Sequence, residues 1–119
     1  MTQDRTLPDC TWREFCLWLL RRRDRRRIEG DSMLPLLQPG EEVLVDPQAY
    51  RKIAPEVGEI VVARHPQKPD LEIIKRIAER LPDCTYVIYG DNLAQSSDSR
   101  QFGPVGRSLI LGKVICRFG

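Results

Sequence analysis

The sequence has little of what a membrane span, a metal centre or a nucleotide site requires. Its longest apolar run covers residues 15–20, whereas a helix that crosses a bilayer needs about 20 apolar residues. It has one histidine, His65, and four cysteines without a C-x-x-C pair, so we expect no zinc site. Neither G-x-x-x-x-G-K-[ST] nor G-x-G-x-x-G occurs, so no nucleotide site is indicated. We therefore expect no metal and no cofactor.

The N-terminal region also lacks the order of a cleaved secretory signal, in which charged residues precede the apolar ones. Here Arg21 follows the apolar run. Without an export signal, a cytoplasmic protein is expected, or one peripheral at the membrane. Reduced thiols are then expected at all four cysteines, which are Cys10, Cys16, Cys84 and Cys116.

What is present fits one small globular domain. The chain has 119 residues, of which 41% are hydrophobic and 30% charged, and this length can bury a core of its own. The net charge of +2 is unevenly distributed: residues 1–30 carry eight arginines against five acidic residues, and residues 31–119 carry eleven basic against twelve acidic residues. The positive charge is therefore concentrated near the N-terminus.

The N-terminal region predicts an amphipathic helix over about residues 12–23. Thr11 and Glu14 have the spacing of a capping box. Apolar side chains then recur on one helical face, and they are Trp12, Phe15, Cys16, Leu19 and Leu20. Six arginines follow within residues 21–27, which indicates a solvated helix end. An anionic lipid surface, with Trp18 beside the apolar face, and a nucleic acid are the alternatives for this run.

The rest of the sequence predicts a mostly β domain. Short β-branched, alternating segments are bounded by Gly, Pro and Asp, and they cover residues 43–45, 59–64, 71–78, 86–89 and 109–117. We therefore expect residues 1–28 to form the helix and the Arg-rich segment, and residues 29–119 to form a compact antiparallel β domain.

Three segments could carry chemistry. In residues 30–35, Gly30 and Pro35 frame Ser32, so the serine hydroxyl could stand on a rigid bend; an ordinary turn serine is the alternative. In residues 71–78, Lys75 shares a strand face with Leu71, Ile73 and Ile77. Burial on that face would lower the pKa of the lysine and supply a general base, whereas a strand-end lysine that reaches solvent is the alternative.

The third segment, residues 90–105, is polar, bounded by glycine and too long for a simple hairpin. Its Asp98 and Arg100 could pair, and a polar surface loop without a catalytic role is the alternative. Other nucleophile schemes fit less well. A Ser-His-Asp triad would need His65, which lies between Arg64 and Pro66 on an expected turn, and the S-x-x-K pattern is absent because Pro35 stands three residues after Ser32.

Taken together, the three segments resemble the type I signal peptidase family, serine peptidases with a Ser/Lys dyad. Residues 30–35 resemble its nucleophile box, residues 58–62 the strand before the base, and residues 74–77 the box that holds the lysine. The late segment matches the pattern G-D-N-x-x-x-S-x-D-S-R-x-x-G at residues 90–103. The resemblance covers residues 30–105 and implies a signal-peptidase or LexA-like β fold.

The resemblance also implies a role for each matching residue. Ser32 would attack the scissile carbonyl and Lys75 would take its proton, as in other Ser-Lys pairs. Ser96 would orient Lys75, and Asp98 would pair with Arg100. The oxyanion and substrate-binding residues would be Gly30, Asp31, Met33 and Pro35, with Met33 and Pro35 in the wall beside the nucleophile. The late segment, which we call the late box, would support the site through Gly90, Asp91, Asn92, Ser99 and Gly103.

Two departures from the family pattern narrow the resemblance. Gly30 stands where many bacterial members have a hydroxyl that donates to the oxyanion, a donor whose loss can cost about 10²–10³ in rate. No segment is long enough for the family's transmembrane helix. The chain therefore looks most like the short maturation proteases of nickel-type superoxide dismutase, which implies that the precursor of that dismutase is the substrate.

Other functions stay open at this point. A LexA-like self-cleaving domain would need an internal Ala-Gly bond, which the sequence lacks. A peripheral-membrane signal peptidase for exported precursors would use residues 12–27 as its membrane contact. A non-catalytic β module that binds nucleic acid through the arginine run belongs to another class, and its binding would fall steeply with salt. We expect the peptidase, with a precursor polypeptide as its partner and no nucleic acid.

Overall fold

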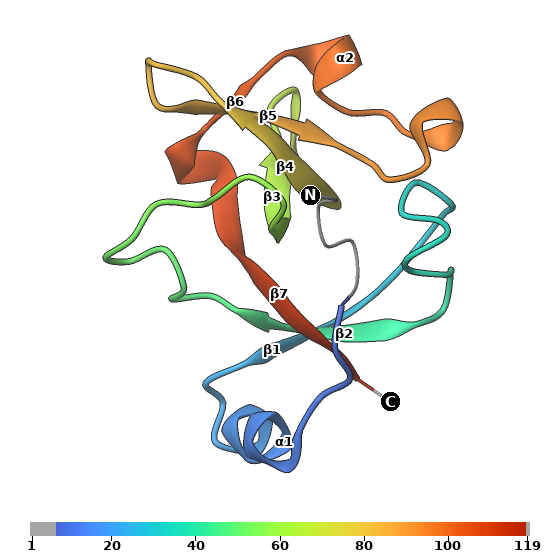
Figure 1. The fold of residues 1–119 in the computed structure, drawn as a ribbon, viewed down its shortest axis with the longest axis vertical. Coiled ribbons are helices and arrows are strands. Elements are labelled where there is room, and N and C mark those ends of the chain that lie inside the picture. Colours follow the sequence, from blue (N-terminus) through green and yellow to red (C-terminus); the bar gives the residue numbers. More distant parts are fainter. Residues whose placement is uncertain (1–6, 119) are drawn as a thin grey trace, which may run out of the picture.

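A seven-stranded sheet forms the body of the protein (Figure 1). The computed structural model describes residues 7–118. The strands are β1 (Asp24–Arg27), β2 (Glu42–Asp46), β3 (Ile60–His65), β4 (Lys68–Arg80), β5 (Thr85–Tyr89), β6 (Val105–Gly106) and β7 (Ile110–Phe118). The helices are α1 (Trp12–Leu19), α2 (Ser99–Phe102) and two short 3-10 helices, η1 (Leu93–Gln95) and η2 (Arg107–Leu109).

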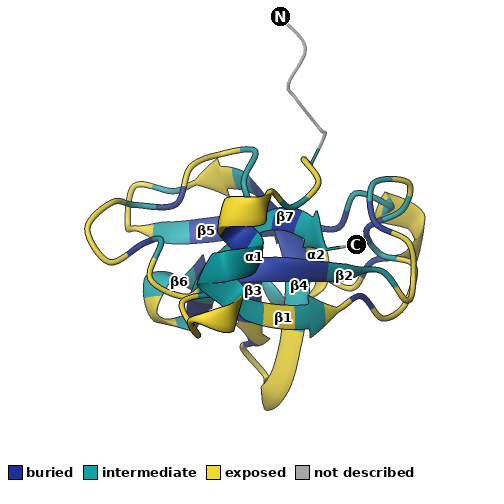
Figure 2. Cartoon of the chain, turned by 90° about the horizontal axis from the view of Figure 1, so that it is seen from below, coloured by how far each residue is buried: buried dark blue, intermediate teal, exposed yellow. Residues whose placement is uncertain are grey.

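All seven strands pair antiparallel in the order β1-β2-β7-β3-β4-β5-β6. This confirms the mostly β prediction with one short N-terminal helix. Each predicted strand is present within one to three residues of its expected ends. In Figure 2 the buried, dark blue residues lie mainly in the strands, whereas exposed residues gather on the loops, at the ends of α1 and at the start of β4.

The sheet has a hydrophobic core on each side of β3, because successive side chains of a strand point to opposite faces. Val62 belongs to one core together with the buried side chains of Met33, Leu37, Val43 and Val114. Val61 and Ala63 belong to the other core, with Ile77, Tyr86, Ile88 and Ile110. The loop after β1 is fixed to the first core through Met33, which is 1% exposed.

Helix α1 begins as predicted but ends earlier. The Thr11 hydroxyl accepts a hydrogen bond from the Glu14 amide at 3.3 Å. The helix ends at Leu19 instead of residue 23, because Arg21 has a left-handed backbone with φ 62° that cannot continue the helix.

The prediction that the arginine run is a solvated helix end is wrong. Residues 24–27 form strand β1, which pairs with β2. The arginine side chains form ion pairs with carboxylates on other elements: Arg23 pairs with Glu14 at 2.7 Å, and Arg26 pairs with Glu72 at 2.9 Å. Tertiary ion pairs and strand pairing thus replace the helix. The 1–28 segment consequently shares its last strand with the sheet of the β domain.

The expectation of four reduced cysteines is also wrong. Cys10 and Cys116 form a disulfide that joins the segment before α1 to β7, while Cys16 and Cys84 are free. Residues 106 apart come together here, which sequence spacing does not reveal. Beside the disulfide, the ring of Phe118 contacts Trp18, with 5.0 Å between the ring centroids. Within residues 7–118, no helix has the length and apolar character of a membrane span.

Candidate active site

Ser32 lies in the loop between β1 and β2. Gly30 turns the chain there with φ +74°, a conformation that favours glycine. The next residue after Ser32, Met33, is buried in the core and anchors the loop. Ser32 itself is half-buried, at the wall of a groove of about 470 Å³ that we call the Ser32 groove.

The Ser32 groove runs between two walls from distant parts of the sequence. One wall comes from residues 27–30, which lead from β1 into the Ser32 loop, and the other comes from β4. Ser32, Met33 and Lys75 all line it, so the structure brings the predicted nucleophile and the predicted base to one cavity. Pro35, which was expected beside Met33, lines a neighbouring pocket instead.

Lys75 lies in the middle of β4 and is only 4% exposed. Its Nζ donates a hydrogen bond to Ser96 Oγ at 3.0 Å, the contact that the family resemblance implied. Burial lowers the pKa of this amine; the nearby charge of Asp98 opposes the shift, and that of Arg100 adds to it. A buried lysine held by a hydroxyl can supply a neutral amine near the serine.

Asp98 lies beyond Ser96 and is fully buried. Burial favours its neutral form, but hydrogen bonds from Arg100, the Gly90 amide and Ser96 lower the pKa of its carboxyl overall. Arg100 Nε donates to Asp98 Oδ1 and the Gly90 amide donates to Oδ2, each at 3.0 Å. The expected Asp98–Arg100 pair is therefore present, and it fixes the loop that carries Ser96.

The late segment also holds the backbone around Ser32. The Asn92 amide donates to the Ser32 carbonyl at 2.8 Å, and Asn92 Nδ2 donates to the Asp31 carbonyl at 3.1 Å. Gly90 leaves no room for a side chain, because a Cβ there would lie 2.3 Å from Ser96 Oγ and 2.5 Å from the Ser32 carbonyl oxygen. These contacts explain why a glycine and an asparagine stand in this loop.

The remaining residues of the late box build its frame. The Ser99 hydroxyl accepts from the Ile88 amide at 2.9 Å, which ties α2 to β5. Gly103 ends α2 with φ +82°. Asp91 forms a two-bond ion pair with Arg76, at 2.8 and 2.9 Å.

Two residues near the site escaped the sequence-based prediction. Arg76 had no assigned role, although its position next to Lys75 places it on the opposite face of the strand. His65 was expected on a turn, but it is the buried last residue of β3, with its ring 4.7 Å from that of Phe102, and it lines the Ser32 groove. Among residues 7–118, no three His, Cys, Asp or Glu side chains meet as metal ligands would.

Comparison with known proteins places the chain in a family. The family model described as "Signal peptidase, peptidase S26" matches residues 19–79 and 78–118. The chain is 35% identical over 112 residues to mitochondrial ATP-independent inner membrane protease subunit 1a of Arabidopsis thaliana, covering 76% of this chain and 67% of that one. It is 34% identical over 107 residues to mitochondrial inner membrane protease subunit 1 of Schizosaccharomyces pombe, covering 74% and 68%.

A third relative is mitochondrial inner membrane protease subunit 2 of Danio rerio. The chain is 33% identical to it over 108 residues, covering 73% of this chain and 59% of the relative. The chain thus spans about three-fifths to two-thirds of the length of the relatives it matches.

Proposed function

The chain belongs to the signal peptidase S26 family, and from this premise we propose that it is a serine endopeptidase that removes an N-terminal leader from a precursor protein. Ser32 is the nucleophile and Lys75 the general base. The observation that carries the proposal is Lys75: its amine is buried, hydrogen-bonded to a serine hydroxyl and opens on the same groove as Ser32. A merely structural lysine would gain nothing from this position, because burial opposes its charge.

The proposed reaction has two stages. Ser32 Oγ attacks the scissile carbonyl while Lys75 Nζ takes the hydroxyl proton, and the Ser32 backbone N–H donates to the oxyanion. Collapse of the tetrahedral intermediate breaks the peptide bond, and Lys75 gives the proton to the leaving amine. Water, deprotonated by Lys75, then attacks the ester carbonyl. Lys75 returns the proton to Ser32 Oγ as the ester bond breaks, and the leader leaves as a carboxylic acid. Ser96, held by the Asp98–Arg100 pair, keeps the amine in place beside the groove during both stages.

The nature of the relatives bears on where the precursor is met. They are inner membrane proteases, which favours a precursor presented at a membrane surface. Trp12 and Leu19 of α1 are exposed, as are Leu20, Arg21 and Arg22 directly after it, so this segment can make a peripheral membrane contact. As the specific substrate we propose the precursor of nickel-type superoxide dismutase. This choice rests on the sequence resemblance alone.

A cleavage assay tests the proposal. Wild type, Ser32→Ala, Lys75→Ala and the exposed control Lys52→Ala are incubated with the nickel-type dismutase precursor and with a precursor that bears an ordinary signal peptide. We expect both site variants to lose about 10³-fold or more in rate and the control to keep wild-type activity. Equal cleavage by all four proteins would overturn the dyad. If the wild type cleaves only the precursor with the ordinary signal peptide, the dismutase precursor is rejected as the substrate and the peptidase function stands.

The alternative of a nucleic-acid-binding β module receives less support. Arg23, Arg25 and Arg26 pair with carboxylates of Glu14, Glu42 and Glu72, so much of the positive charge of the arginine run is already balanced. A binding module would also keep its function in the Ser32→Ala variant, which the same set of proteins tests.

A further inference from the structure

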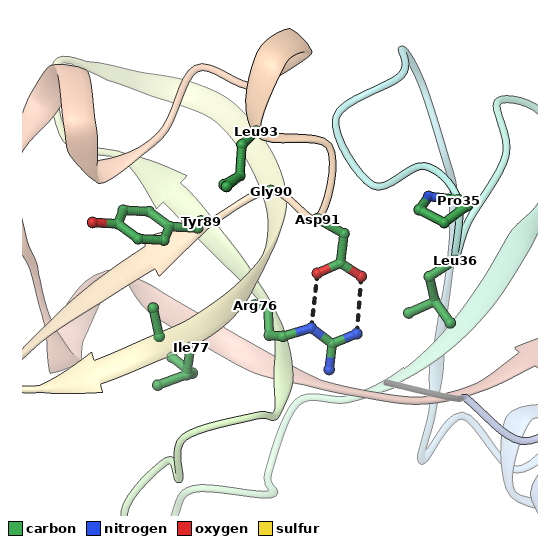
Figure 3. A pocket seen from close by; sticks show the side chains of 9 residues that line it. Pro35, Leu36, Arg76, Ile77, Tyr89, Gly90, Asp91 and Leu93 are labelled. Carbon is green, nitrogen blue, oxygen red and sulfur yellow. Dashed lines mark hydrogen bonds and ion pairs between the residues drawn. The ribbon is translucent and has the colours of Figure 1, made fainter. Parts of the chain in front are cut away.

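A second pocket, which we call the Leu93 pocket, adjoins the Ser32 groove. Figure 3 shows the side chains that line it. It has a volume of about 560 Å³, within the usual range of about 300–1,000 Å³ for ligand pockets. Like the groove, this pocket draws on the Ser32 loop, on β4 and on the segment after β5, here through residues 35–36, 76–78 and 89–93 without Asn92. The reaction proposed for Ser32 and Lys75 assigns no role to this pocket.

The two cavities are neighbours across a thin partition. On β4, Lys75 lines the groove and Arg76 lines the pocket. Gly90 lines the pocket, yet a Cβ on it would lie 2.5 Å from the carbonyl oxygen of Ser32. An extended chain advances about 3.3 Å per residue, so we expect a peptide that passes from Ser32 over Gly90 to reach the pocket with its first or second residue.

The lining of the pocket predicts what it accepts. Figure 3 shows Leu93, Tyr89 and Ile77 on one side and Pro35 and Leu36 on the other, and these side chains are apolar or aromatic. Leu93 is 52% exposed, so a bound apolar side chain would cover surface that now faces water, which is favourable.

The charged side chains of the pocket do not call for a charged ligand. Arg76 and Asp91 are each 6% exposed and pair with each other through two hydrogen bonds. Arg76 Nη1 also donates to the Gly58 carbonyl at 2.7 Å. A charged guest would have to compete with this buried pair and lose its own hydration, so the pocket should reject acidic and basic side chains.

We propose that the Leu93 pocket is the subsite for a large apolar side chain at the first or second residue after the scissile bond. The assignment rests on the proposed peptidase function. If the leader fills the Ser32 groove, the peptide that follows the bond leaves Ser32 on another side, and the Leu93 pocket lies next to the groove along β4 and at Gly90. The enzyme therefore reads the start of the mature protein as well as its leader.

A binding measurement tests the pocket without catalysis. Methyl NMR spectra of the Ser32→Ala protein are recorded with a hexapeptide that begins with two leucines and with a matched hexapeptide that begins with two aspartates. We expect the leucine peptide to shift the methyl signals of Leu36 and Leu93 and to bind about tenfold more tightly than the aspartate peptide. Equal binding of both peptides, or unshifted pocket methyls, overturns the proposal.

A cleavage series distinguishes this proposal from the peptidase function itself. Once product sequencing has located the bond in a cleaved precursor, the two following residues are changed to alanine, leucine or aspartate. We expect kcat/KM to be about tenfold higher for leucine than for aspartate, and Leu93→Ser to reduce this preference to about twofold. Ile53→Ser removes an exposed apolar side chain outside both cavities and should leave it unchanged.

The outcomes separate cleanly. Cleavage without any preference at the two positions overturns the subsite and leaves the peptidase function standing. If the preference keeps its size in Leu93→Ser, it does not arise in the Leu93 pocket, and the subsite is again overturned. Failure to cleave any precursor overturns the peptidase function, and the subsite assignment with it.

Discussion

The molecule contains two basic regions that differ in how their positive charge is compensated. The arginines of residues 23–26 lie near the surface and meet carboxylates: Arg26, for example, pairs with Glu72 at 2.9 Å with 40% of its side chain exposed. Lys75 is buried and its hydrogen bond goes to the Ser96 hydroxyl at 3.0 Å. The nearest carboxylate in this network, Asp98, is already engaged by Arg100 and the Gly90 amide.

The difference indicates which basic residues can do chemistry. An exposed guanidinium beside a carboxylate stays charged and contributes little to stability. A buried amine without a counterion of its own has its charged form disfavoured, so it can accept a proton. The arrangement around Lys75 thus suits the proposed general base, whereas the arginine run forms ion pairs at the surface.

The largest effect that separates the two regions should come from Gly90→Ala. The new methyl group would clash with Ser96 Oγ and the Ser32 carbonyl oxygen, so it would move both the proposed nucleophile, Ser32, and the hydroxyl that holds the proposed base. We expect a loss of about 10²-fold or more in kcat/KM and of about 1–3 kcal/mol in the free energy of unfolding. Urea titration and the cleavage assay measure these effects.

The structure offers a matched control for that variant. At Gly106 a Cβ would meet no atom within 4 Å, so Gly106→Ala should keep both stability and activity. Equal behaviour of the two alanine variants would mean that the contact between the late loop and the Ser32 loop is not what holds the site.

A smaller effect is expected from Ser96→Ala. It removes the hydroxyl that holds Lys75 Nζ and leaves the backbone frame in place. We expect kcat to fall about 10- to 100-fold with little change in KM, because the amine is misdirected while the groove is preserved. Ser108→Ala, on an exposed serine, is the control. A rise in KM without a fall in kcat would assign Ser96 to substrate binding.

The sequence was sufficient to predict the features that depend on local patterns. The apolar residues that alternate along residues 71–77 predicted that Lys75 is buried, and it is. The face was predicted less well: Leu71 is 45% exposed, and Arg76 on the opposite face is as buried as Lys75. The spacing of Thr11 and Glu14 predicted the start of α1. The late box also predicted the Asp98–Arg100 contact, since the two residues are only two positions apart.

Features that depend on distant contacts could not be predicted in the same way. The end of α1 and the strand at residues 24–27 depend on pairing with β2 and on carboxylates as far away as Glu72. The Cys10–Cys116 disulfide joins residues 106 apart. The Leu93 pocket combines three segments whose residues show no common pattern until the sheet folds.

The smallest effect should come from the arginine run. Arg25 pairs with Glu42 and lies over the ring of Phe118 at 4.3 Å, at the surface of the molecule. Because exposed ion pairs are screened by water and salt, we expect Arg25→Gln to keep kcat/KM within about twofold. A cleavage assay at low and high salt measures this. A loss comparable to that of Ser96→Ala would show that the run takes part in the site.

The ionisation of Lys75 is the most direct test of the account. Its side-chain signals can be followed by NMR over a pH titration, beside the pH dependence of kcat/KM. Since burial lowers the pKa from 10.5, the neutral amine should form below pH 10.5, and kcat/KM should rise with pH through the same midpoint. Between the lowered pKa and pH 10.5, Lys75 is neutral in the folded protein but still protonated in the unfolded chain. The free energy of unfolding should therefore rise with pH over this range. A Lys75 midpoint at or above 10.5, or activity indifferent to it, would contradict the assignment of Lys75 as the base.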